Sequence, residues 1–341
     1  MIYHGDAIAY IKETPDILSH LYENKEKIMN APALSELEGA GDIIIVGTGS
    51  SYNAGVMVRE SLQYILRRRV SVLYPSELEA ELMVSALDTL VIGISQQGTS
   101  IAVIEALDKA SKSDKKTIAM TGEENTEITR HSDYVVMIEC GEEDAGATTK
   151  GFSATAFTLL CLALKLAGKN CEHLDVCEKE IAEIPDTMRN ALNKNQVYLE
   201  SIAENMAGFK QLIIISSDSL RNLTMEIALK FSETCRKPVM GMDSEVFCHG
   251  MYNAVQDETT FLIVADEKDE KIIRLEEYYH RFKNPVFRLD VMKYKSNLAQ
   301  LFATIICIQY LFVLTSRKMG INLNIPKDPD FHKIMGSKIE M

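Results

Sequence analysis

The stretch Asp42-Ile43-Ile44-Ile45-Val46-Gly47-Thr48-Gly49-Ser50-Ser51-Tyr52-Asn53-Ala54-Gly55 decides the fold of this chain. It begins with a run of β-branched residues, passes through a turn rich in glycine and hydroxyl side chains, and opens a segment of helical periodicity. An apolar run without polar alternation is typical of a strand buried on both faces of a parallel sheet. The turn would then lie at the carboxyl end of a strand, where open α/β sheets bind ligands.

The same alternation of strand and helix continues along the chain. After the strand Asp42–Val46 we expect further strands at Val70–Leu73, Leu90–Ile94, Lys116–Met120, Tyr134–Ile138, Gln211–Ile215, Phe261–Val264 and Val286–Leu289. We expect helices at about 52–67, 76–86, 100–112, 150–206, 219–236, 268–281 and 295–316. The pattern predicts an α/β protein with two mostly parallel, doubly wound sheets flanked by helices.

The length of 341 residues predicts about two domains. We expect an N-terminal helical cap at 1–40, a first domain at 41–184 that binds phosphate, a second at 185–325 that carries the catalytic groups, and a C-terminal tail at 326–341 near the site. The boundary is placed near Ile184–Pro185, where a proline and polar residues follow a charged helix.

Composition and charge exclude several classes of protein. Hydrophobic residues make up 46% of the chain and charged residues 25%, as in ordinary globular proteins. The net charge of −13 disfavours a nucleic-acid partner, and the basic run Arg67–Arg69 is interpreted as a solvated helix end. The N-terminus lacks the pattern of a signal peptide, and we expect no stretch that approaches the roughly 20 apolar residues of a membrane span. We therefore expect no nucleic acid and no membrane as partners.

The cysteines indicate a reducing, cytoplasmic location without a structural metal. There are seven, an odd number, mostly scattered and without a C-x-x-C pair. The cluster Cys171, His173 and Cys177 has a spacing that matches no zinc motif. We expect neither a metal nor another cofactor.

The first turn, Gly47 to Gly55, leaves two interpretations open. A dinucleotide site would need a glycine where Tyr52 stands, and a P-loop would need a lysine that the turn lacks. A phosphate could bind at the start of the following helix, where free N–H groups and partial positive charge are available. Alternatively, the segment is a tight structural turn whose helix is capped by Ser50 or Ser51.

A second turn repeats this arrangement at Gly93-Ile94-Ser95-Gln96-Gln97-Gly98-Thr99-Ser100. A buried strand again precedes hydroxyl and amide side chains around a glycine, and a helix again follows. Small hydroxyls can bind a phosphate monoester through neutral hydrogen bonds, while the helix dipole supplies charge complementarity. Two such turns could converge on the phosphate of a sugar.

These motifs together resemble a known family. The segments GTGSSYNAG, ISQQGTS and ATTKGF, the helix segment Glu226-Ile-Ala-Leu-Lys230-Phe-Ser-Glu233, and the pair His249-Gly250 sixteen residues after Glu233 are similar to the SIS (sugar isomerase) domains of glucosamine-fructose-6-phosphate aminotransferase. The resemblance spans nearly the whole chain. It implies a tandem SIS architecture and a sugar phosphate as the small-molecule partner.

The resemblance also implies roles for individual residues. The predicted substrate and phosphate ligands are Ser50, Ser51, Ser95, Gln96, Gln97, Ser100 and Thr148. Glu233 matches the base of the enolisation step, and His249 matches a histidine that manages oxygen protons and that comes from the neighbouring subunit in relatives. The resemblance therefore implies a homodimer or a dimer of dimers with shared active sites. Lys230 lies one turn before Glu233 and could serve the site or only form a surface ion pair.

Three departures narrow the expected reaction. Residue 2 is isoleucine where the aminotransferase opens with a nucleophilic cysteine, and the glutaminase half has no counterpart here, so we do not expect glutamine as ammonia donor. Gln97 replaces the usual serine. Gly336 stands where the family has a lysine near its C-terminus, although Lys338 lies two residues further on.

The leading hypothesis is an enzyme of the phosphosugar isomerase, deaminase and deglycase group. Moving a proton between C1 and C2 of an open-chain sugar needs a carboxylate base and a second group for the oxygen protons. We favour C–N cleavage of an amino-sugar or fructosyl-amino-acid 6-phosphate, with simple aldose/ketose isomerisation as an alternative. A noncatalytic phosphosugar sensor is the competing class, but the acidic segment before the first strand fits a DNA-binding helix-turn-helix poorly.

Overall fold

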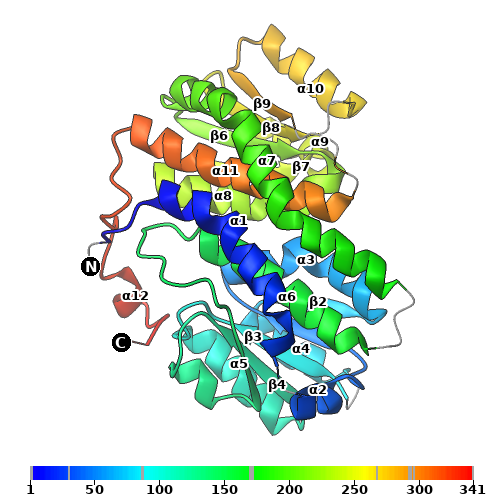
Figure 1. Cartoon of the computed structure of the whole chain (residues 1–341). Helices are drawn as coiled ribbons and strands as arrows, with labels where there is room; N and C mark the ends of the chain where they lie inside the picture. Colours follow the sequence, from blue (N-terminus) through cyan, green and yellow to red (C-terminus); the bar gives the residue numbers. More distant parts are fainter. Residues whose placement is uncertain are drawn as a thin grey trace.

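The computed structural model describes residues 3–29, 31–85, 88–168, 173–265, 268–290, 294 and 296–339. Two parallel sheets lie at opposite ends of the molecule (Figure 1). The first has the order β2-β1-β3-β4-β5 and the second the order β7-β6-β8-β9. The strands are β1 Ile43–Val46, β2 Val70–Leu73, β3 Leu90–Ile94, β4 Lys116–Thr121, β5 Tyr134–Met137, β6 Gln211–Ser216, β7 Val239–Asp243, β8 Thr259–Ala265 and β9 Val286–Asp290. The predicted α/β fold with parallel sheets is confirmed.

Helices flank both faces of each sheet. The α-helices are α1 Ala7–Glu23, α2 Ala31–Leu37, α3 Ser50–Leu66, α4 Leu78–Leu82, α5 Ile101–Lys112, α6 Lys150–Ala167, α7 Leu174–Met206, α8 Arg221–Cys235, α9 Ser244–Cys248, α10 Glu270–Arg281, α11 Asn297–Lys318 and α12 Phe331–Ile334. Short 3-10 turns occur at Lys25–Lys27, Pro75–Glu77, Glu127–Arg130, Asp218–Leu220 and Met251–Ala254.

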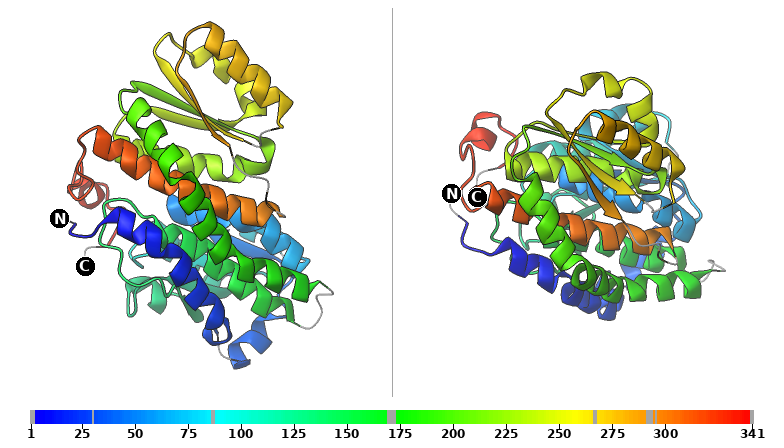
Figure 2. Two further views of the ribbon diagram at one scale, coloured as in Figure 1. Left: turned by 45° about the horizontal axis from the view of Figure 1, so that its top comes forward. Right: turned by 90° about the horizontal axis from the view of Figure 1, so that it is seen from above.

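One hydrophobic core is shared by the inner faces of both sheets. Successive strand residues point to opposite faces, so Ile43 and Ile45 of β1 pack inward while Ile44 and Val46 pack outward under α5. The second sheet repeats this, since Ile214 of β6 joins the inner core and its neighbours pack under α9 and α10. Helices α1, α3, α6, α7, α8 and α11 fill the space between the sheets, as Figure 2 shows from two sides.

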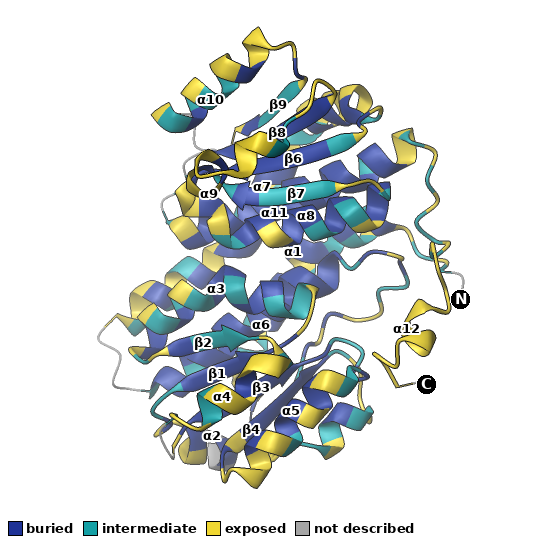
Figure 3. Ribbon diagram, turned by 180° about the vertical axis from the view of Figure 1, so that it is seen from behind, coloured by how far each residue is buried: buried dark blue, intermediate teal, exposed yellow. Residues whose placement is uncertain are grey.

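The predicted strands are confirmed, but the sequence missed β7. Figure 3 shows the central strands as buried and the strand β7 as mostly half-buried at the edge of its sheet. An edge strand with Gly241 at its centre lacks the continuous apolar run by which the others were recognised. The predicted helix at 76–86 is also shorter than expected, because a 3-10 turn at Pro75–Glu77 precedes α4, which ends at Leu82.

Helix α7 runs through the expected domain boundary. It continues past Pro185 without a break, and the core on which it packs contains residues of both sheets. The division at Ile184–Pro185 therefore remains a prediction, and it would cut a helix. The expected phosphate-binding and catalytic segments occupy different halves around this common core.

In the part of the chain that the structure describes, two helices are long and apolar enough to cross a membrane by length and composition, which differs from the expectation from the sequence. These are α6, with a mean hydropathy of 1.3, and α11, with a mean hydropathy of 1.9. Inside the protein 94% of the apolar window of α6 and 89% of that of α11 are buried. Both helices are therefore accounted for as core helices between the two sheets.

The shared core predicts that a cavity between α8 and α11 destabilises the whole protein. Phe312 of α11 is fully buried and meets Phe231 of α8 edge to face, with ring centroids 6.2 Å apart. We expect Phe312→Ala to lower the free energy of unfolding by about 3–5 kcal/mol, measured by urea denaturation. The control Phe282→Ala, at a side chain 60% exposed, should change it by less than about 0.5 kcal/mol. A loss below about 1 kcal/mol for Phe312→Ala would contradict the shared core.

Candidate active site

The first predicted turn is tied directly to the second half of the chain. Ser50 Oγ donates a hydrogen bond of 3.0 Å to Glu226 Oε1, and Asn53 Nδ2 donates one of 2.8 Å to Glu226 Oε2. Ser50 and Asn53 lie in the first turn of α3, and Glu226 lies on α8. Because Glu226 is 1% exposed, these two donors replace the water that a carboxylate would otherwise bind. The carboxyl edge of the first sheet is thus fixed against α8.

Three charged side chains share one face of α8. Glu226, Lys230 and Glu233 follow one another at intervals of four and three residues, which places them on the same side of a helix. Lys230 Nζ lies 2.8 Å from Glu233 Oε2 and 3.9 Å from Glu226 Oε1. Lys230 is 3% exposed, whereas the side chain of Glu233 is 42% exposed. The predicted base is therefore accessible and is held by a buried cation.

Burial and neighbouring charges act in opposite directions on the pKa values of Glu226 and Lys230. Burial raises the pKa of Glu226, although Lys230, Asn53 and Ser50 all favour its charged form. Burial acts to lower the pKa of Lys230, but Glu233 and Glu226 more than offset it, so that this pKa is raised. Lys230 therefore stays an ammonium and favours the ionised form of the neighbouring carboxylates. The i,i+3 ion pair of Lys230 with Glu233 that the sequence suggested is present, but its ammonium is buried instead of lying at the surface.

The second predicted turn connects β3 to α5. Its serine hydroxyl, Ser95 Oγ, accepts a hydrogen bond of 3.3 Å from the backbone N–H of Ser100. Gly98 has φ +66°, and a Cβ there would come within 2.0 Å of Thr126 Oγ1, so the turn requires glycine. Ser95 is buried and Ser100 is half-buried at the start of α5, where its side chain forms no cap. The first N–H groups of α5 are thus not capped by Ser100.

The two glutamines of this turn have different partners. Gln96 Oε1 accepts a hydrogen bond of 2.9 Å from Thr155 Oγ1, and Gln96 Nε2 donates one of 3.2 Å to Cys140 Sγ. Gln97 Oε1 accepts one of 2.9 Å from Lys338 Nζ. Gln96 is thereby held against α6, whereas Gln97 points to the C-terminal segment.

The loop before α6 completes the surroundings. Glu143 accepts hydrogen bonds from the backbone N–H groups of Thr149, Lys150 and Gly151 and from Thr149 Oγ1, at 2.6–3.0 Å. A Cβ at Gly151 would lie 3.0 Å from both Glu143 Oε2 and Thr148 Cγ2 and 3.2 Å from Gln96 Cδ. The predicted Thr148 is thus half-buried beside Gln96. Glu143 also acts electrostatically on Lys230, so this loop faces the charged side of α8.

Two predicted residues have fewer connections within one chain. Ser51 is half-buried in α3, and its backbone N–H donates to the carbonyl of Thr48 at 3.2 Å. His249 lies at the end of α9, where Nδ1 donates to the carbonyl of Glu245 at 2.7 Å. Its side chain is 77% exposed, and its partner among the described residues is Glu245, which is not one of the other predicted site residues. The structure thus brings the predicted turns to α8, but it leaves His249 on the outside of the second half.

The sequence reading missed three residues that build this site. Glu226 stands inside the quoted helix segment, and its spacing from Lys230 and Glu233 was the available signal. Asn53 was quoted only as part of the first turn. Glu143 lies in an irregular loop, and no pattern in the sequence singles it out.

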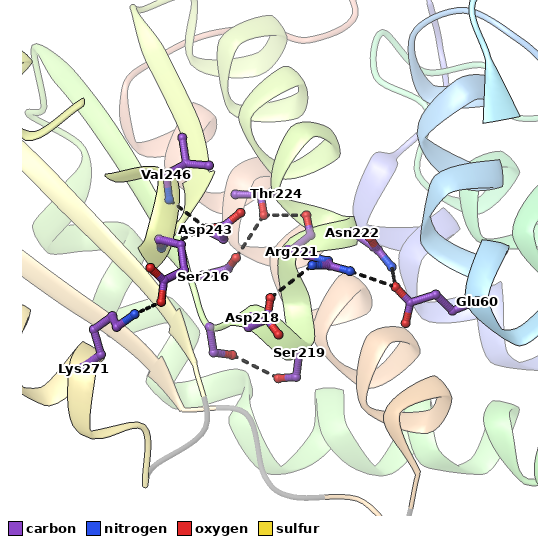
Figure 4. Close-up of polar contacts among 12 residues, drawn as sticks. Glu60, Ser216, Asp218, Ser219, Arg221, Asn222, Thr224, Asp243, Val246 and Lys271 are labelled. Atoms are coloured by element: carbon purple, nitrogen blue, oxygen red, sulfur yellow. Dashed lines mark hydrogen bonds and ion pairs between the residues drawn. The ribbon is translucent and has the colours of Figure 1, made fainter. Parts of the chain in front are cut away.

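The corresponding edge of the second sheet has a different chemistry, which Figure 4 shows. There Asp218 lies just after β6, and Arg221 Nη1 lies 3.3 Å from its Oδ1. Arg221 Nη2 also lies 3.4 Å from Glu60 Oε1. Asp243, at the end of β7, accepts the backbone N–H groups of Glu245 and Val246 and so caps α9. Carboxylates therefore occupy the turns at this edge, which disfavours a phosphate dianion there.

The arrangement suits a monoanionic or dianionic ligand whose neighbouring carbons carry an acidic proton. The neutral donors come from the turns after β1 and β3, and the accessible carboxylate is that of Glu233 on α8. Among the described residues no group of three metal-ligating side chains occurs; Cys171, of the cluster discussed above, lies outside them. The chemistry available from these side chains is hydrogen bonding and proton transfer.

Comparison with known proteins agrees with this geometry. The profile of the SIS domain matches residues 36–165. The chain is 25% identical over 243 residues to glutamine–fructose-6-phosphate aminotransferase [isomerizing] of Clostridium tetani, a match that covers 69% of this chain and 39% of that protein. The chain thus spans about two fifths of the length of this relative.

Solved structures are similar over nearly the entire chain. A Clostridium difficile 630 protein, provisionally called a phosphosugar isomerase, is 29% identical with a TM-score of 0.91, and the match covers 98% of this chain and 99% of that one. Glucosamine-6-phosphate deaminase of Thermotoga maritima is 21% identical with a TM-score of 0.76 and coverages of 94% and 97%, which shows a shared fold. The chain therefore contains a SIS domain at residues 36–165 and is homologous to the isomerase domain of glutamine–fructose-6-phosphate aminotransferase.

Proposed function

We propose that this chain is an enzyme that cleaves the C–N bond of an amino-sugar or fructosyl-amino-acid 6-phosphate through an enediol or enolamine intermediate. The observation that carries the proposal is the position of Glu233. Its carboxylate is 42% exposed, is bonded at 2.8 Å to the buried Lys230, and lies on the helix face that Ser50 joins to the first turn. A base is thus held beside a group of phosphate-type donors.

The phosphate is bound by the turns of the first half. The side chains of Ser51, Ser95 and Ser100 supply donors without charge, and the dipole of α5 favours an anion near the start of this helix. Ser50 and Gln96 already have protein partners, Glu226 and Thr155. Their role is then to shape the pocket while Thr148 faces the sugar.

Glu233 removes a proton from the carbon next to the carbonyl or imine. A general base of this kind contributes roughly 10²–10⁴-fold to the rate. Lys230 orients the carboxylate, because its buried ammonium remains charged and lies 2.8 Å from Glu233 Oε2. The proton is returned to the neighbouring carbon, which gives an imine that water then hydrolyses to a carbonyl and the free amine. Simple aldose/ketose isomerisation would use the same base.

His249 acts in the site of a second copy of the chain. The histidine at the end of α9 is 77% exposed, and among the described residues its side chain pairs with Glu245 and not with the Glu233 cluster of its own chain. A homodimer, or a dimer of dimers, would supply it to the partner's site, where it protonates the ring oxygen of the sugar. We further propose a cytoplasmic location, since the described cysteines are all free thiols.

The base role predicts a specific loss of turnover. We expect Glu233→Gln to lower kcat by about 100-fold or more on the active member of a panel of sugar, amino-sugar and fructosyl-amino-acid 6-phosphates. Binding of that substrate, measured by calorimetry, should change by less than about threefold. The control is Glu204→Gln, at an exposed carboxylate paired with Lys318. Equal turnover by Glu233→Gln and wild type would remove the base role, and tight binding by wild type without any turnover would establish a sensor instead.

The buried ammonium predicts a stability change that depends on pH. In Lys230→Met the carboxylates of Glu226 and Glu233 lose their cation, so we expect unfolding to become easier by about 3–5 kcal/mol at pH 8. The pKa of Glu226 is raised in the folded protein, so its charged form opposes folding. The free energy of unfolding therefore falls as the pH rises through the folded-state pKa of Glu226. The loss should therefore be smaller at pH 5 than at pH 8 in urea denaturation.

A matched control separates this effect from an ordinary surface pair. Lys210→Met removes a lysine whose pair with Glu258 is exposed on both sides, so it should cost no more than about 1 kcal/mol at either pH. A similar cost for Lys230→Met, or a greater loss at pH 5, would contradict the proposed burial of charge.

Shared sites predict complementation between inactive variants. Glu233→Gln and His249→Asn should each lose most of their turnover alone. After co-expression, about half of the dimers are mixed, and each mixed dimer contains one site with both changes and one unchanged site. About a quarter of the wild-type rate should therefore return. Recovery within the error of the separate variants would show that each chain uses its own His249.

A further inference from the structure

The C-terminal segment is attached to the second turn of the candidate site. The backbone N–H of Ile339 donates to the carbonyl of Thr99 at 2.9 Å, and Ile101 N–H donates to the carbonyl of Ser337 at 3.4 Å. These bonds flank an antiparallel bridge between Ser100 and Lys338. In Figure 1 the chain after α11 runs along one side of the molecule to the first half, where α12 lies.

The same segment is also fixed to α8. Arg236, the residue that ends this helix, donates through Nη2 to the carbonyl of Ile325 at 2.5 Å and to that of Asn322 at 3.4 Å. Residues 322–339 are therefore anchored at the end of α8 and again at the turn before α5. Two anchors determine where the side chain of Lys338 lies.

Lys338 places a cation without a carboxylate partner at this turn. Its Nζ donates to Gln97 Oε1 at 2.9 Å, and among the described residues no carboxylate lies within ion-pair distance of it. Burial lowers the pKa of Lys338 and nearby Lys230 lowers it further, whereas Glu233 acts in the opposite direction. Glu233 is itself bonded to Lys230, so the ammonium of Lys338 remains available to another anion.

A phosphate dianion at this turn would be stabilised further by such a cation. The turn ligands are neutral, and the chain carries a net charge of −13, so the helix dipole alone would have to balance two negative charges. A charge-assisted hydrogen bond from an ammonium to a phosphate oxygen is roughly twice as strong as a neutral one. Lys338 lies opposite Ser100, at the end of the site where the turn donors converge.

We propose that Lys338 binds the phosphate group of the substrate and that Gln97 is a positioning residue that directs its ammonium to the turn. The inference rests on the proposed function and assigns its phosphate contact. It also joins two departures from the family pattern, since the glutamine that replaces a serine is the side chain that contacts the displaced lysine. Lys338 is then a ligand of the phosphate rather than a group at the reacting carbons.

The test measures binding by the full-length protein with calorimetry. The probes are inorganic phosphate, fructose 6-phosphate and fructose. We expect Lys338→Met to weaken the binding of inorganic phosphate and of fructose 6-phosphate roughly tenfold or more. Lys338→Arg should recover most of the lost affinity. Fructose binding should be unchanged. With an active substrate, KM should rise while kcat changes less than threefold.

Two controls isolate the pair. Lys327→Met removes another exposed lysine from the same segment and should leave phosphate binding within twofold of wild type. Gln97→Ala should weaken phosphate binding, and its effect should largely disappear in the presence of Lys338→Met, because a positioning residue acts only through its partner.

Three outcomes would overturn the inference. One is a Lys338→Met effect on phosphate no larger than that of Lys327→Met. Another is a fall in kcat with unchanged KM, which would place Lys338 at the reacting carbons. The third is that the effects of Gln97→Ala and Lys338→Met on the free energy of phosphate binding add fully. If the inference fails in these ways while the wild type still turns over a sugar phosphate, the proposed function stands. If the wild type binds no sugar phosphate at all, both the inference and the proposed function are wrong.

Discussion

The buried ammonium of Lys230 organises the candidate site. It lies between Glu226 and Glu233 on one face of α8, and Ser50 and Asn53 of the first half bond to Glu226. A buried charge of this kind is tolerated only when it is paired and hydrogen-bonded. The contact therefore fixes α3 against α8 and, with them, the distance between the turns of the first sheet and the carboxylate of the second half.

This constraint explains why binding and proton transfer belong to different parts of one chain. Both sheets pack on the helices that lie between them and share one core, so the carboxyl edges of their strands keep a constant relation. The first sheet ends in glycine and hydroxyl turns that suit an anion, whereas the second ends in Asp218 and Asp243. In the proposed function, a single phosphate position would orient the sugar toward Glu233.

Much of this arrangement could be predicted from the sequence, because the signals were local. The strands β1 and β3, their turns and the helix spacing of Lys230 and Glu233 are each contained in a short segment. The role of Glu226 was missed because its partner Ser50 is 176 residues away. Likewise, Gln97 and Lys338 are 241 residues apart, and only the fold shows that they touch. Strand β7 was missed because it is an edge strand with a central glycine.

The most direct test of the central claim is exchange of substrate protons with solvent. In D₂O, NMR should show that the protein incorporates deuterium at C1 or C2 of a ketose or amino-sugar 6-phosphate, because a base near those carbons transfers protons through an enediol or enolamine. The account predicts no incorporation into the corresponding sugar without phosphate. Absence of exchange with every phosphorylated sugar, or equal exchange with and without the phosphate, would contradict it.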